Sequence, residues 1–295
     1  MRKRRFMQVD VFSPRAGRGN PLAVVIDSEG LDAAQMQQFA AWMNLSETSF
    51  LLPPTQSAAD YRVRIFTPRQ ELPFAGHPSV GAAWVAVEAG IAQPREGRLI
   101  QECAAGLLEV RVETGADGRR THVRAPDARI RELATRRQAQ LAAILAGVGV
   151  FDPRSSRLVN NGPEWLLAEL ADEESVRRFP PPLTSIGQLC EEISAVGLAI
   201  FARCANPEYQ LVVRAFCPAD GIPEDPVTGS ANAAIAAQLH ASGALDVIGP
   251  SYRASQGREV GRDGIIEVSV TGRDQVWIGG DTVTAIKGAL TWPCE

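Results

Sequence analysis

The sequence predicts an α+β fold made of two similar lobes. Two stretches share one order of residues: Arg-x-Phe-x-Pro, a Glu that begins a Pro-containing loop, a Gly, and an Ala-rich run that closes on another Gly. Gly229 lies 153 residues after Gly76, and Gly243 lies 153 residues after Gly90. A repeat this long predicts two homologous lobes rather than a solenoid, and helices among many short strands favour α+β. We place the lobes at residues 1–125 and 126–295.

In the first lobe, short runs rich in Val, Ile or Phe and bounded by Gly, Pro or Asn predict the strands. Asp32 is placed to cap a helix whose apolar residues recur at helical spacing. The Ala-rich run after Gly76 predicts a second helix. The expected strands are residues 8–12, 22–26, 50–53, 61–67 and 107–112, and the expected helices are residues 32–43 and 79–89.

The second lobe repeats this mixture. The charged stretch at residues 127–137 is the expected crossover into it, and Gly279-Gly280 is placed as a hairpin turn near its end. The Ala-rich run after Gly229 again predicts a helix. The expected strands are residues 157–160, 166–169, 199–202, 209–216, 265–271, 275–279 and 281–287.

Composition excludes several classes of protein. The net charge of −4 gives no electrostatic reason to bind nucleic acid, and no run is long and apolar enough to span a membrane. The five cysteines are odd in number and never spaced as Cys-x-x-Cys, which is typical of reduced thiols and not of a disulfide frame or a zinc site. No apolar segment follows the basic residues 1–5, so we expect a cytoplasmic protein without a signal peptide.

Polar residues gather around the two glycines that begin the repeated helices. At Gly76 and Gly229, free backbone N–H groups and the positive end of the helix dipole attract negative charge. One such Gly would merely permit a tight turn, but two at matched positions favour a cleft for a small carboxylate or an enolate. His77 and Ser230 follow them at equivalent positions, and Asp225 lies five residues before Ser230. Taken singly, these would be a neutral His, a helix cap and a turn residue.

Four motifs, in this order along the chain, resemble the PhzF-like (phenazine biosynthesis) family. They are Gly-Asn-Pro-Leu-Ala-Val at residues 19–24, Asn-Leu-Ser-Glu-Thr-Ser-Phe at 44–50, Phe-Ala-Gly-His-Pro at 74–78 and Glu-Asp-Pro-Val-Thr-Gly-Ser at 224–230. The resemblance extends over essentially the whole chain. It implies a diaminopimelate-epimerase-like fold, in which two pseudo-symmetric lobes each wrap a curved mixed sheet around a central helix. It also implies an active site between the lobes, an isomerase that needs no cofactor and no metal, and commonly a homodimer.

The resemblance also assigns roles to individual residues. Glu47 matches the acid/base residue that moves a proton between two carbons of a small carboxylated substrate. His77, Asp225 and Ser230 match residues that orient this substrate and assist the transfer. A carboxylate in a weakly solvated cleft suits both halves of such a reaction, since it can accept the proton and return it. The expected substrate-binding residues lie beside these: Ser46, Gly76 and Gly229.

Two departures from related sequences limit the resemblance. Cofactor-independent epimerases of this fold use a pair of cysteines at the two helix starts, where this chain has Ala75 and Thr228. Two-cysteine epimerisation is therefore not expected. Many relatives carry Pro-Ser where this chain has Asp263-Gly264, so the resemblance does not identify the substrate as the phenazine precursor.

Two further hypotheses remain at this point. One is a racemase or epimerase that uses other bases, such as Glu47 against Asp225. The other is a binding or interaction protein that retains the fold without catalysis, because a fold does not guarantee an activity.

Overall fold

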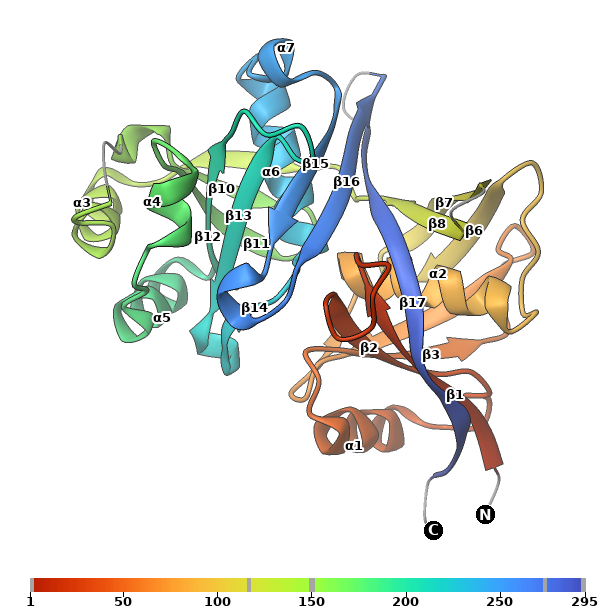
Figure 1. The fold of residues 1–295 in the computed structure, drawn as a ribbon. Coiled ribbons are helices and arrows are strands. Elements are labelled where there is room, and N and C mark those ends of the chain that lie inside the picture. The colour runs from red at the N-terminus through yellow and green to blue at the C-terminus, as the bar shows by residue number, and fades with distance from the viewer. Residues whose placement is uncertain (1–2, 116–117, 149–151, 273–274, 293–295) are drawn as a thin grey trace. The chain divides into compact units, whose positions relative to one another are not determined.

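The chain divides into two compact units. The computed structural model describes residues 3–115, 118–148, 152–272 and 275–292 (Figure 1). The first unit comprises Met1–Arg124 and Ile278–Glu295, and the second unit comprises Ala125–Trp277. The sequence assigned residues 278–295 to the second lobe, whereas they belong to the first unit. The reason is backbone pairing: β17 (Gln275–Thr291) runs antiparallel to β1 (Lys3–Val11) along the whole of β1.

The strands of the first unit form one sheet that closes on itself. The order runs from β17 through β1, β2, β3, β4, β6 and β7 to β8, and β8 pairs again with β17. The β2–β3 and β4–β6 pairs are parallel. A short strand, β5, pairs with β4. The bounds are β2 (Asn20–Val25), β3 (Thr48–Leu52), β4 (Tyr61–Phe66), β5 (Glu71–Leu72), β6 (Arg98–Cys103), β7 (Gly106–Gly115) and β8 (Gly118–Arg124).

The second unit has the same alternation of parallel and antiparallel pairs. Its order is β9, β10, β11, β12, β13, β15 and β16, with β14 paired to β13. The parallel pairs are β11–β12 and β13–β15. The bounds are β9 (Arg129–Glu132), β10 (Arg157–Asn160), β11 (Glu164–Glu169), β12 (Gly197–Arg203), β13 (Leu211–Cys217), β14 (Ile222–Asp225), β15 (Ser251–Gln256) and β16 (Gly264–Thr271).

Each unit contains one long helix that is almost wholly buried. In the first unit it is α2 (Gly76–Glu88), which packs on β1, β2, β3, β4 and β8; in the second it is α6 (Gly229–Ala241), which packs on β10, β11 and β16. Both consist mostly of Ala, Gly and Val or Ile, so that strands can approach from several sides. Gly81 shows how close the approach is, because a Cβ there would overlap the side chains of Leu22 and Val11.

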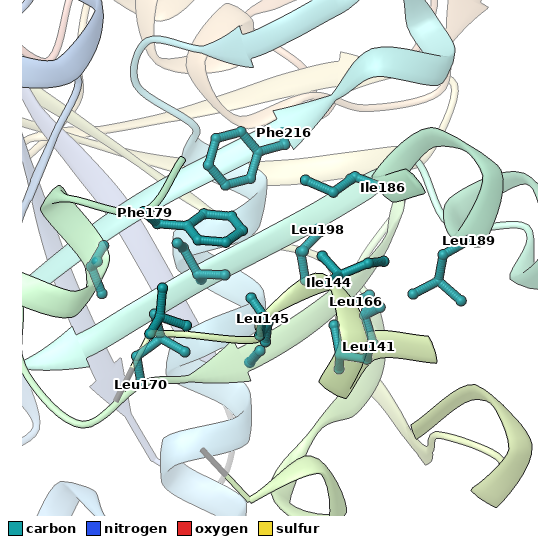
Figure 2. Packing of buried hydrophobic residues seen from close by; sticks show 14 of the residues in the cluster. Leu141, Ile144, Leu145, Leu166, Leu170, Phe179, Ile186, Leu189, Leu198 and Phe216 are labelled. Carbon is teal, nitrogen blue, oxygen red and sulfur yellow. The ribbon is translucent and has the colours of Figure 1, made fainter. Parts of the chain in front are cut away.

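The outer helices cover the sheets, and two of them connect parallel strands. Helix α1 connects β2 to β3, and α5 connects β11 to β12, as parallel pairs require. In the second unit, α3, α4 and α5 cover an apolar cluster that includes Leu141, Leu166, Phe179 and Phe216 (Figure 2). The bounds are α1 (Ala33–Met43), α3 (Thr135–Ile144), α4 (Glu173–Arg177), α5 (Leu183–Ile193) and α7 (Leu245–Ile248).

The repeated Arg-x-Phe and Glu of the sequence make the same contact in both units. Arg64 on β4 donates two hydrogen bonds of 2.6 Å to the Glu71 carboxylate. Arg214 on β13 donates two hydrogen bonds, of 2.9 and 2.8 Å, to the Glu224 carboxylate. The two guanidinium carbons lie 5.2 and 5.0 Å from the ring centres of the following Phe residues. Arg214 also donates to the carbonyl oxygen of Phe179, 2.6 Å away. These ion pairs tie the Pro-bearing loops to their sheets just before each buried helix begins.

Three local expectations have clear outcomes. The helix predicted at residues 32–43 is confirmed, with Asp32 at its N-cap in a reciprocal capping box with Gln35. The predicted hairpin turn at Gly279-Gly280 is wrong, because β17 runs straight through it. A Cβ at Gly279 would overlap the Thr121 carbonyl oxygen and the His122 ring, so this Gly allows close approach to β8. The stretch expected as a crossover forms β9 and the start of α3 within the second unit.

Within the described residues, none of the helices combines the length and the apolar character needed to cross a membrane.

The two Arg–Glu pairs differ in burial, and their removal should differ in cost. Arg214 and Glu224 are 6% and 8% exposed, whereas Arg64 and Glu71 are 27% and 35% exposed. Glu224→Gln should lower the free energy of unfolding by about 3 kcal/mol, because it leaves a buried guanidinium without its charged partner. The matched variant Glu71→Gln should cost less than about 1 kcal/mol. Urea unfolding of both variants measures this, and equal losses would contradict the expectation.

Candidate active site

The first unit brings Glu47 and His77 together. Helix α1 ends at Asn44 in the left-handed conformation, with φ of 53°, which turns the chain toward Glu47 just before β3. His77 is the second residue of α2. The Oε2 atom of Glu47 lies 3.6 Å from Nδ1 of His77, and the side chains are 16% and 3% exposed. A carboxylate and an imidazole thus lie in contact, shielded from most water, at the start of the buried helix.

Asn20 joins this pair, and the sequence did not single it out as a site residue. It is the first residue of β2 and is fully buried. Its Nδ2 atom lies 3.4 Å from Nδ1 of His77, and its Oδ1 atom lies 3.5 Å from Oγ of Ser46. The signal was present in the Gly-Asn-Pro motif, but that motif reveals nothing about which side chain Asn20 meets. Together Asn20, Ser46, Glu47 and His77 form the first polar cluster.

The second unit holds Asp225 in a closed hydrogen-bond network. The Thr228 hydroxyl donates to Oδ2 of Asp225 over 2.6 Å, and it accepts from Nε2 of Gln256 over 2.8 Å. Gln256 also donates to the Asp225 carbonyl oxygen and accepts from the Thr228 amide, each over 3.0 Å. A fifth bond of the network runs from Asn232 Nδ2 to Gln256 Oε1 over 3.0 Å. Because every donor and acceptor of the Gln256 amide is used, the position of Asp225 is tightly defined.

Ser230 has a different set of partners. It is the second residue of α6, and its Oγ atom accepts a hydrogen bond from Nε1 of Trp165 over 3.1 Å. Its carbonyl oxygen accepts from Nδ2 of Asn161 over 2.9 Å. All three side chains are buried. The sequence does not single out Trp165, since an aromatic residue on a strand reveals nothing about the target of its N–H group.

The starts of α2 and α6 supply backbone donors. The first helical hydrogen bonds run from Ser79 N to Ala75 O and from Asn232 N to Thr228 O. The amides just before them, which include those of Gly76 and Gly229, therefore have no acceptor inside the helix. With the helix dipole they form an environment that favours negative charge.

The loop after Gln256 contains Asp263 and Gly264, where many related sequences carry Pro-Ser. Arg258 donates to Oδ1 of Asp263 over 2.9 Å, and its guanidinium lies 5.2 Å from the centre of the Tyr209 ring. The hydrogen bond to Asp263 raises the pKa of the Arg258 guanidinium. A Cβ at Gly264 would overlap the side chain of Val227, so Gly264 makes room for the residue next to Thr228. Asp263 and Gly264 are therefore fitted to this chain's own loop.

The positions of the absent cysteine pair are now visible. Ala75 and Thr228 are the N-cap residues of α2 and α6. Elsewhere, burial raises the pKa of the Cys190 thiol to about 12 and that of Cys204 to about 11, so neither favours a thiolate. Among the residues that the structure describes, no group of three or more His, Cys, Asp or Glu side chains could hold a metal ion.

The predicted residues thus fall into two groups. Glu47, His77 and Ser46 belong to the first polar cluster, while Asp225 and Ser230 flank the start of α6 in the second unit. The structure adds Asn20, Thr228, Gln256, Trp165 and Asn161 as their direct or linked partners.

The profile of the PhzC-PhzF family, described as phenazine biosynthesis-like protein, matches residues 9–288. The antisense-enhancing sequence 1 protein of Schizosaccharomyces pombe is 35% identical, covering 98% of this chain and 99% of its own. A trans-2,3-dihydro-3-hydroxyanthranilate isomerase from Pseudomonas fluorescens is 30% identical, covering 97% of this chain and 98% of its own. The crystal structure of a PhzF-family protein from Bacillus anthracis has the same fold, with a TM-score of 0.82 at 23% identity over 99% of this chain and 100% of that one. The predictions of the family and of the isomerase class are confirmed.

The network around Asp225 allows a test that removes one hydroxyl group. Thr228→Val should lower the free energy of unfolding by about 1–3 kcal/mol, because it removes the hydroxyl that bridges Asp225 and Gln256 in a buried place. Thr228→Ser keeps the hydroxyl and loses only a methyl group, so it should cost about 1 kcal/mol or less. Chemical denaturation measures both. If the Ser variant loses as much as the Val variant, the hydroxyl bridge does not stabilise this turn.

Proposed function

Because the chain belongs to the PhzC-PhzF family of phenazine biosynthesis-like proteins, we propose that it is an isomerase that moves a proton within a small carboxylated metabolite without a cofactor. The observation that carries the proposal is the contact between the Glu47 carboxylate and the His77 imidazole at the start of a buried helix. A shielded carboxylate beside a second proton-active group has the chemistry that acid/base catalysis at carbon requires.

In the proposed reaction, Glu47 carries the proton in both directions. Its carboxylate removes a proton from a carbon of the substrate, and the electron pair left behind spreads into the neighbouring unsaturated or carbonyl group. The protonated Glu47 then returns the proton to a different carbon, so that the substrate loses and gains nothing overall. His77, with Asn20 beside it, holds the Glu47 carboxylate in position and assists the transfer.

Asp225, Ser230 and the helix starts are proposed to orient the substrate. Backbone N–H groups at Gly76 and Gly229 suit a carboxylate and the negative charge that builds up as the proton leaves. The Ser230 and Ser46 hydroxyl groups add polar contacts. The Asp225 carboxylate can accept a hydrogen bond from a hydroxyl or amino substituent of the substrate.

The substrate class is proposed from the same features. The name of the Pseudomonas fluorescens relative makes trans-2,3-dihydro-3-hydroxyanthranilate the first compound to try. In this chain, Gly264 makes room for Val227, the residue next to Thr228, and Asp263 accepts a hydrogen bond from Arg258. We therefore place the substrate among small unsaturated carboxylic acids and do not restrict it to that compound. We also propose that the protein is cytoplasmic and forms a homodimer.

We also propose that the two units are copies of one ancestral unit, each built around its buried helix. The support is the shared alternation of strand pairs and the paired Arg–Glu contacts. The helices end alike as well: Gly90 and Gly243 follow α2 and α6 with φ of 72° and 75°.

The test is solvent-deuterium uptake. The protein is incubated in heavy water with trans-2,3-dihydro-3-hydroxyanthranilate and a panel of small carboxylic acids, and product formation and mass are followed. Glu47→Gln should fold normally and lower turnover by about 100-fold or more, as loss of an acid/base group does. Glu29→Gln, an exposed change in the same unit, is the control and should behave as wild type.

The outcomes separate the hypotheses. Unchanged turnover in Glu47→Gln would refute the assigned role of Glu47. Deuterium entering from both faces of one carbon would favour a racemase or epimerase in which Asp225 is the second base, whereas transfer on a single face supports the isomerase. If no acid gives product or takes up deuterium, the result favours a binding protein.

A further inference from the structure

The hydrogen bond between Trp165 and Ser230 has only one possible direction. An indole N–H donates and cannot accept, whereas a Ser hydroxyl has one proton to donate and two lone pairs. Trp165 Nε1 lies 3.1 Å from Ser230 Oγ, so Trp165 is the donor and Ser230 the acceptor. The hydroxyl proton of Ser230 must therefore point to another group. Among the described residues, none of the contacts of Ser230 provides an acceptor for that proton.

The Trp165 ring is held in one place by the sheet. Trp165 lies on β11, paired with Val159 of β10 on one side and with Gly197 of β12 on the other. A Cβ at Gly197 would come within 2.8 Å of the Trp165 ring, so Gly197 leaves the space that the ring fills. The side chain is 3% exposed. An aromatic donor fixed on a central strand is a rigid support for a neighbouring polar residue.

The backbone of Ser230 is fixed from the same side. Asn161, which follows β10, donates to the Ser230 carbonyl oxygen. Asn161 is the first residue of the short connection after β10, and Trp165 is the second residue of β11, which follows that connection. One short segment therefore holds both the main chain and the hydroxyl oxygen of Ser230.

We propose that Trp165 is a positioning residue that makes Ser230 a hydrogen-bond donor toward an acceptor oxygen of the substrate, a carboxylate or the oxygen of an enolate. This inference rests on the proposed isomerase function and extends it by assigning the direction of one contact. The spare hydroxyl proton lies at the start of α6, where the first backbone amides also donate. The group that fits there is an oxygen that accepts several hydrogen bonds and gains charge in the reaction.

The first arm of the test needs no substrate. In a ¹H–¹⁵N NMR spectrum, the indole N–H resonance of Trp165 is identified as the one lost in Trp165→Phe. Ser230→Ala should shift that resonance toward the position of an indole without a hydrogen bond. The indole of Trp277, which donates to Thr271 Oγ1 over the same 3.1 Å, is an internal control and should not move.

The second arm measures turnover of the acid selected by the heavy-water screen. Trp165→Phe keeps an aromatic ring and loses the N–H group, and should lower kcat about tenfold, with KM changed less than about threefold, as expected when one oriented hydrogen bond to the transition state is weakened. Trp277→Phe removes an equivalent indole–hydroxyl bond and should leave kcat unchanged. In the Ser230→Ala background, Trp165→Phe should have no further effect on kcat, because the two residues act as one unit.

Three results would overturn the inference. The first is a Trp165 resonance that does not shift in Ser230→Ala, and the second is a Trp165→Phe variant as active as wild type. The third is an equal loss of kcat on Trp165→Phe in the wild-type and Ser230→Ala backgrounds. If wild type turns over none of the acids, the proposed function fails. The NMR arm then still decides whether Trp165 fixes Ser230 as a donor.

Discussion

The burial of α2 and α6 is the constraint on which the rest of the structure depends. A buried helix that packs on several strands carries mostly small or apolar side chains, as both helices do. Its first amides cannot bond within the helix, so the N-terminus is the polar end of an otherwise apolar element. Two of the candidate site residues therefore lie at these helix starts: His77 in the first unit and Ser230 in the second. The remaining candidate residues lie on segments that end close to these two positions.

The two units use different side chains around these helix starts. In the first unit, Asn20 and Glu47 approach His77 from β2 and from the turn after α1. In the second, Trp165 and Asn161 approach Ser230 from the β10–β11 segment, while Gln256 at the end of β15 fixes Thr228 and Asp225. A carboxylate next to an imidazole suits proton transfer, and a network of satisfied donors and acceptors suits orientation. The difference between the clusters thus supports the proposed division between proton transfer by Glu47 and substrate orientation around α6.

Much of this arrangement could be predicted from the sequence, and the exceptions have physical causes. The capped helix at Asp32 and the two glycine-led helices follow from local signals that need no partner. The Gly279-Gly280 pair misled because two glycines are typical both of a turn and of a strand that another backbone approaches closely, and only tertiary contact with β8 distinguishes them. Trp165 and Gln256 were not predicted as site residues, for a similar reason. Trp165 donates one hydrogen bond to a residue 65 positions away, and the Gln256 amide bonds residues 24 to 31 positions away; no periodicity encodes such contacts.

The most direct test of the central claim compares two replacements of Glu47 that differ in one property. Glu47→Asp keeps a carboxylate but draws it back by one methylene, whereas Glu47→Gln keeps the length and removes the charge. The rate of solvent-deuterium uptake by the acid that wild type converts is measured for both. The account predicts slow but measurable uptake with Glu47→Asp and none above background with Glu47→Gln. Equal residual uptake with the two variants would contradict it, because the proton would then be carried by another group.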